Sequence, residues 1–126
     1  HIMAYQKSSF ITAILIIVTV ITRQDNFEIF NSIEIITSFQ SRFGPQEWLQ
    51  PYTDKTLESL PKEGKKNILT ICPGFASDCV ETLEEILIQG KESFLSFGGQ
   101  YFDMITCLND NDEHIILLKS LNEKNI

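Results

Sequence analysis

The sequence predicts an α/β three-layer domain with a mainly parallel sheet. The apolar run Asn67–Phe75 is typical of a central strand, and an amphipathic helix pattern, Ser77–Gln89, follows it at once. A second strand pattern, Phe102–Cys107, comes after a pair of glycines. Strand and helix signals therefore alternate as they do around parallel sheets.

The N-terminal region holds a short tag and a strongly apolar run. His1–Met3 is predicted to be a cloning remnant, and residues 4–126 a single domain. The run Phe10–Ile21 is too short to span a bilayer as a helix and has no signal-peptide cleavage site. A buried strand and an all-round buried helix both fit it, and its β-branched residues favour the strand. Because it is so apolar, this run is also a candidate surface for self-association.

Two further elements are predicted before the central strand. Ile33–Phe39 is a short β-branched strand pattern. Thr53–Glu63 is a helix pattern that stops at Gly64, and Pro61 should distort its last turn.

Glycines and cap residues predict the elements that follow the Ser77–Gln89 helix. Gly90, Gly98 and Gly99 are predicted breaks around a short helix, Lys91–Phe97. Asp112–Glu123 is predicted as a closing helix, capped by Asn111 or by the aspartate after it.

The start of the Ser77–Gln89 helix carries a stripe of acids. Asp78, Glu81 and Glu85 are three and four residues apart, so on an α-helix they share one face. The opposite face, predicted to pack against the core, carries Val80, Leu83, Ile86 and Leu87. Acids in this arrangement suit cation handling or proton transfer. They also fit a capping box, in which Asp78 accepts an amide of the first turn and Glu81 reaches back.

Charge and cysteine content narrow the function classes. The net charge of −7 argues against a nucleic-acid partner, because phosphate binding needs the opposite sign. Three cysteines, an odd number without disulfide-like spacing, indicate a reduced cytoplasmic protein.

Four blocks of the sequence occur in a specific order and spacing. They are Ser38–Asp54, Lys66–Leu69, Gly74–Ile86 and Cys107–Asp110. Together they resemble the C-terminal half of a bacterial ferrochelatase, from about residue 33 to the end of the chain. The resemblance implies one lobe of the two-lobed chelatase fold. It also implies a role in haem biosynthesis, in which this lyase inserts ferrous iron into protoporphyrin IX.

The resemblance also implies roles for individual residues. Glu81 matches the acid that lies over the porphyrin and takes part in proton removal or metal passage. With it, Asp78 and Glu85 match the acids along the metal route. The implied porphyrin-binding residues are Gln40, Ser41, Arg42 and Trp48. An indole suits stacking on a macrocycle, and a guanidinium suits a propionate. Two segments, Gln40–Arg42 and Phe75–Asp78, lie at the ends of predicted strands. We therefore expect both at the carboxyl edge of the sheet.

The sequence departs from the family pattern in two places. It lacks the Ser-x-His-Gly setting of the histidine that faces the acid across the porphyrin, and His114 is predicted to be a helix-surface residue. Cys79 stands where some members have histidine. We therefore expect little activity from this chain alone, which needs an N-terminal lobe or self-association. The alternative is a non-catalytic porphyrin-binding or interaction module, or a truncated fragment.

No resident cofactor is predicted from these residues, and ferrous iron is expected as the substrate metal. An iron–sulfur cluster normally takes four protein ligands, whereas Cys72, Cys79 and Cys107 supply three, so a cluster is not expected. Cys72 and Cys107 lie in apolar strand patterns and are predicted to be small core residues. The predicted location is the cytoplasm, with at most peripheral membrane contact.

Overall fold

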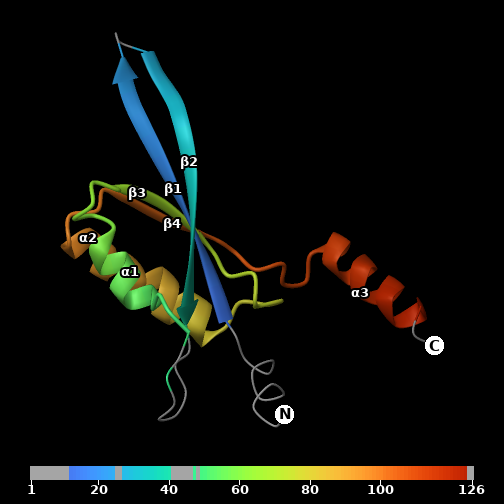
Figure 1. Cartoon of the computed structure of the whole chain (residues 1–126). Helices are drawn as coiled ribbons and strands as arrows, with labels where there is room; N and C mark the ends of the chain where they lie inside the picture. Colours follow the sequence, from blue (N-terminus) through green and yellow to red (C-terminus); the bar gives the residue numbers. More distant parts are fainter. Residues whose placement is uncertain (1–11, 25–26, 41–46, 48, 125–126) are drawn as a thin grey trace, which may run out of the picture.

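A computed structural model describes residues 12–24, 27–40, 47 and 49–124 of the chain. Its elements are β1 (Thr12–Gln24), β2 (Phe27–Gln40), α1 (Thr53–Ser59), β3 (Asn67–Ile71), the π-helix η2 (Glu81–Gly90), α2 (Lys91–Ser96), β4 (Tyr101–Ile105) and α3 (Asp112–Lys124) (Figure 1). Helices alternate with strands from β2 onwards, so the predicted α/β class is confirmed.

The four strands form one sheet in the order β2-β1-β3-β4. β1 runs antiparallel to both of its neighbours, whereas β3 and β4 are parallel. β1 and β2 are separated by only two residues in the sequence, a spacing that allows a hairpin but no parallel crossover. Because β2 and β3 both oppose β1, the strands β2, β3 and β4 point the same way and end at one edge of the sheet.

The two strand predictions for the N-terminal region are confirmed in the described residues. The apolar run Phe10–Ile21 forms most of β1 from Thr12 onwards, and its first two residues lie outside the described part. The strand predicted at Ile33–Phe39 lies within the longer β2. β1 occupies an interior position of the sheet, which agrees with its β-branched sequence.

One face of the sheet is covered by helices, because α1, η2 and α2 lie together on one side of it (Figure 1). Buried and more exposed residues alternate along β3 and β4, as expected when one face of a sheet is packed. The core consists of Leu57, Leu60, Ile68, Cys72, Ile86, Phe94, Phe102 and Met104. On the opposite face of β4, Tyr101 and Ile105 are exposed.

α1 is shorter than the predicted Thr53–Glu63 helix. It ends at Ser59, and the chain then turns through Pro61 to Gly64, which has φ +85°. Proline has no amide hydrogen with which to continue the helical ladder, so the distortion expected from Pro61 becomes the end of the helix.

Gly90 is not the predicted break, because η2 continues directly into α2. A Cβ atom at Gly90 would lie 3.0 Å from Leu57 Cδ1, so glycine here permits the close approach of α1. Gly98, at φ +99°, ends α2 as predicted.

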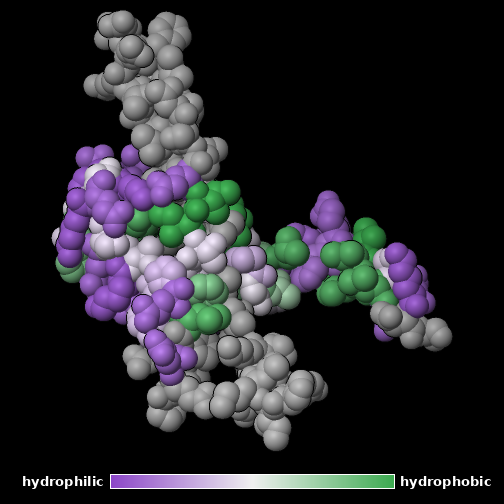
Figure 2. Space-filling view, viewed as in Figure 1, coloured by the Kyte–Doolittle hydropathy of each residue, from purple (hydrophilic) through white to green (hydrophobic). Residues whose placement is uncertain are grey.

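α3 extends away from the sheet and the other helices (Figure 1). The Asn111 cap is confirmed, since Asn111 Oδ1 accepts the His114 amide hydrogen at 2.8 Å. Large apolar side chains are exposed along this helix, as its hydrophobic surface in Figure 2 illustrates: Ile115, Ile116, Leu117, Leu118 and Leu121. In the described part of the chain, no helix has both the length and the apolar character needed to cross a bilayer.

Candidate functional site

The edge at which β2, β3 and β4 end brings two of the predicted site segments together. β3 and β4 end at Ile71 and Ile105, earlier than predicted, and loops follow both strands. Gln40 is the last residue of β2, and its Nε2 donates a hydrogen bond of 2.7 Å to Glu85 Oε2 on η2. A residue implied for porphyrin binding therefore contacts a residue implied for the metal route.

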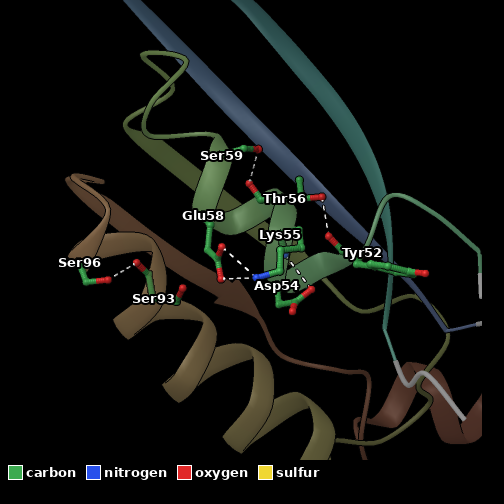
Figure 3. A network of polar contacts seen from close by, with 8 residues as sticks. All are labelled: Tyr52, Asp54, Lys55, Thr56, Glu58, Ser59, Ser93 and Ser96. Atoms are coloured by element: carbon green, nitrogen blue, oxygen red, sulfur yellow. Dashed lines mark hydrogen bonds and ion pairs between the residues drawn. The ribbon is translucent and has the colours of Figure 1, made fainter.

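A surface hollow of about 240 Å³ lies beside this contact. Its polar lining residues are Gln40, Thr53, Asp54, Glu85, Gln89 and Ser93. The hydroxyls of Ser38 and Thr53 form a buried hydrogen bond of 3.0 Å, which fixes α1 against β2. The first turn of α1 is held by the Thr56 hydroxyl, which donates to the Tyr52 carbonyl at 2.8 Å (Figure 3). The hollow therefore has firmly held walls, and Leu57 and Ile86 line it beside these polar residues.

The acidic helix η2 is a π-helix rather than the predicted α-helix. Glu81 and Glu85 are half-buried, whereas Glu84 is exposed. The i→i+5 hydrogen bonds of a π-helix widen each turn, so residues four apart remain on one face. Glu81 and Glu85 therefore keep the shared face that their spacing predicts.

The apolar face of η2 agrees with the prediction only in its second half. Ile86 is buried and Leu87 packs against the core. Val80 and Leu83 are 68% and 44% exposed, so their predicted packing is wrong. In the wider π-helical turn, Leu83 lies farther round the helix from Ile86 than it would in an α-helix.

Asp78 does not belong to the acidic face, because η2 begins only at Glu81. The predicted helix start is therefore wrong. In the loop after β3, the Asp78 carboxylate accepts hydrogen bonds from Asn109 Nδ2 at 2.8 Å, Thr82 Oγ1 at 3.0 Å and the Cys107 amide at 3.3 Å. These bonds, led by the one from Asn109, favour the ionised carboxylate and lower the pKa of Asp78.

The predicted capping box is replaced by a different arrangement. No side chain caps η2 at Val80. The Cys79 amide donates to Thr82 Oγ1 at 2.9 Å, so Thr82 makes the reach-back bond expected of Glu81. Capping therefore does not explain the acid at position 81.

The three cysteines are free thiols. Burial raises the pKa of Cys72, which is a core residue as predicted, to about 12. Burial and the neighbouring Asp78 raise the pKa of the half-buried Cys107 to about 11. Thiols with pKa values this high stay protonated near neutral pH. Among the described residues, no three His, Cys, Asp or Glu side chains form a group that could hold a metal ion.

His114 is buried, so its prediction as a helix-surface residue is wrong. Its Nδ1 lies 2.7 Å from the carbonyl oxygen of Asn109. Because a carbonyl only accepts hydrogen bonds, Nδ1 carries the proton in this contact. Asn109 has φ +51°, a left-handed conformation that asparagine tolerates. The contact ties the first turn of α3 to the loop after β4.

Some predicted residues cannot be compared with the structure, and some contacts were not predicted. Three residues implied for porphyrin binding lie outside the described residues: Ser41, Arg42 and Trp48. Sequence patterns alone assign no role to Thr82 or Asn109. Asn109 lies in the matching block Cys107–Asp110, and that match was the one signal that could have pointed to it.

Comparisons with known proteins agree with the resemblance read from the sequence. A ferrochelatase from Pseudoalteromonas atlantica is 55% identical over 93 residues, which are 74% of this chain and 26% of the relative. Ferrochelatases from Chelativorans sp. and Yersinia pestis are each 56% identical, over 70% and 74% of this chain and 25% and 29% of the relatives. The chain thus spans about a quarter of the length of these relatives. The sequence model of the ferrochelatase family matches residues 4–126, and the chain belongs to that family.

Proposed function

We propose that this chain is the C-terminal part of a ferrochelatase, which inserts ferrous iron into protoporphyrin IX in haem biosynthesis. The hydrogen bond between Gln40 and Glu85 carries the proposal. It joins the segment proposed to hold the porphyrin to the helix proposed to supply the acids. One macrocycle presents propionates at its rim and nitrogens at its centre, so an enzyme acting on it needs both groups in one site.

Glu81 is the proposed proton acceptor for the pyrrole nitrogens, since a carboxylate can take up a proton at the reacting atom. Its place on η2, on the same face as Glu85, supports this role. Glu85 is proposed to guide the ferrous ion, and the bond from Gln40 orients its carboxylate.

The porphyrin itself is proposed to contact Gln40 and the residues that follow it in the sequence. Ser41 and Arg42 would hold a propionate through charge-assisted hydrogen bonds. The indole of Trp48 would stack on the macrocycle. The reaction is proposed to take place in the cytoplasm of a bacterium.

The chain alone is expected to insert little or no metal. Its sequence contains no Ser-x-His-Gly segment, the setting of the histidine expected on the opposite side of the porphyrin. A lobe carrying that histidine is the proposed partner. The alternative, a non-catalytic porphyrin-binding module, would need the pocket but not the proton acceptor.

The test is a fusion of this chain to a histidine-bearing N-terminal lobe, assayed by porphyrin absorbance. We expect the fusion to insert metal and Glu81→Gln to abolish insertion, because an amide cannot accept the pyrrole proton. The Tm of Glu81→Gln should stay within about 4 °C of the parent, because the amide has the size of the carboxylate and the capping bond is made by Thr82. Glu84→Gln, an exposed change on the same helix, is the matched control and should keep full turnover. Near-normal turnover in Glu81→Gln would reject the catalytic role and favour the binding module.

A further inference from the structure

The loops after β3 and β4 are joined by a reciprocal pair of hydrogen bonds. The Asp78 amide donates to Asn109 Oδ1 at 2.8 Å, and Asn109 Nδ2 donates to Asp78 Oδ2 at 2.8 Å. The Asn109 amide adds a third link by donating to the Ala76 carbonyl at 2.9 Å. One asparagine therefore fixes the loop that leads into η2.

The same aspartate connects this pair to the start of η2. Asp78 Oδ1 accepts from Thr82 Oγ1 at 3.0 Å and from the Cys107 amide at 3.3 Å. Thr82 is fully buried and directly follows Glu81 in the sequence. Any shift of Asp78 would therefore pull on the backbone that carries Glu81.

The carboxylate of Asp78 already accepts three hydrogen bonds from the protein. A metal ion would have to displace at least part of this set, and the buried Thr82 hydroxyl would then keep only the Cys79 carbonyl, at 3.1 Å, as its acceptor. These contacts suit a group that holds a loop in place better than a group that passes cations onward.

We propose that Asp78 and Asn109 are positioning residues, whose paired side chains hold the start of η2 and thereby set the place of Glu81 in the site. The role assigned to Glu81 rests on the proposed ferrochelatase function. In this account Asp78 acts through Thr82 and is not a ligand on the metal route.

A reciprocal exchange separates a positioning role from a need for charge at position 78. In the double variant Asp78→Asn/Asn109→Asp, the new amide oxygen can accept from Thr82 and the Cys107 amide. The new amide nitrogen can donate to the carboxylate at 109, which still accepts from the backbone amide of residue 78. All four hydrogen bonds can be kept while the negative charge moves to the other loop. Aspartate also tolerates the left-handed conformation at position 109.

Each single change should break the pair. Asp78→Asn sets two amide NH₂ groups against each other, and Asn109→Asp sets two carboxylates against each other. Asn109→Gly removes the side chain and leaves the left-handed backbone unstrained. In the 126-residue chain we expect each of the three to lower Tm by roughly 5 °C or more. The amide of residue 78 should exchange on the order of tenfold faster.

The double variant should recover most of the lost Tm and amide protection, which a pair of independent sites would not do. Additive losses in the double variant would overturn the proposal. This first arm of the test measures Tm and amide exchange and needs no catalysis. Its outcome therefore does not depend on the proposed function.

The second arm uses the fused enzyme. We expect Asn109→Gly to lower kcat about tenfold or more with little change in KM for porphyrin, because a displaced Glu81 would slow the chemical step. The double variant should return to within about threefold of the parent. A double variant that melts like the parent but stays inactive would show that charge at Asp78 itself is required, and the positioning role would be rejected. If the parent fusion fails to insert metal, the proposed function fails while the first arm still decides whether the pair holds the loop.

Discussion

η2 and α3 are both helices that follow strands ending at the same edge of the sheet, yet only η2 is built into the core. Thr82 and Ile86 of η2 are 0% and 1% exposed, and α2 continues directly from its last residue. α3 has one buried residue, His114, and its Ile116 is 66% exposed. A helix of 13 residues without packing is marginal in water. The difference indicates that Glu81 and Glu85, the acids proposed for the site, lie on a helix that is packed into the core.

The two helices are nevertheless linked through one residue. Asn109 bonds Asp78 before η2 through its side chain, and its carbonyl accepts from His114 in α3. η2 and α3 are therefore both connected to the loop after β4.

The largest expected difference between the two helices is in the loss of stability when one isoleucine in each is shortened to alanine. Ile86→Ala should lower the free energy of unfolding by about 3 kcal/mol, because it opens a cavity in the core. Ile116→Ala on exposed α3 should change it by no more than about 0.5 kcal/mol. Urea denaturation of the two variants measures both values. Equal losses would mean that α3 is packed as firmly as η2.

A smaller effect on stability is expected at acidic pH. The hydrogen bonds to Asp78 lower its pKa below the ordinary value of 3.8, so the folded state favours the carboxylate. The contribution of Asp78 to the stability of the folded state is therefore present above about pH 4, and it is lost as the pH falls through the lowered pKa. We expect Asp78→Asn to flatten the fall in Tm below pH 4. Asp112→Asn, at the exposed start of α3, is the control and should leave that fall unchanged. An unchanged slope in Asp78→Asn would contradict the account.

Much of the fold could be predicted from local patterns. The β-branched run in β1, the apolar β3 and the Asn111 cap were each recognised from residue type and spacing. The reversed direction of β1 was not, because strand pairing depends on partners that a local pattern does not contain. The continuous passage from η2 through Gly90 into α2 was also missed, since the close contact that favours glycine there comes from Leu57 in another helix.

The site could be predicted in part. The spacing of Glu81 and Glu85 predicted their shared face correctly, because four residues return to the same side in either kind of helix. The place of Asp78 could not be predicted from spacing, since its partner Asn109 lies 31 residues away. The burial of His114 was missed for the same reason: its ring contacts a carbonyl outside its own helix.

Hydrogen exchange of two matched amides tests the contrast between η2 and α3 most directly. The amides of Ile86 and Leu118 would be followed in one sample of the 126-residue chain, at a concentration where it is monomeric. We predict that the Ile86 amide exchanges only through global unfolding, with a free energy equal to that from urea denaturation. The Leu118 amide should exchange on the order of a hundredfold faster or more, through local unfolding of α3. Equal protection of the two amides, or an Ile86 amide that exchanges through local opening, would contradict the account.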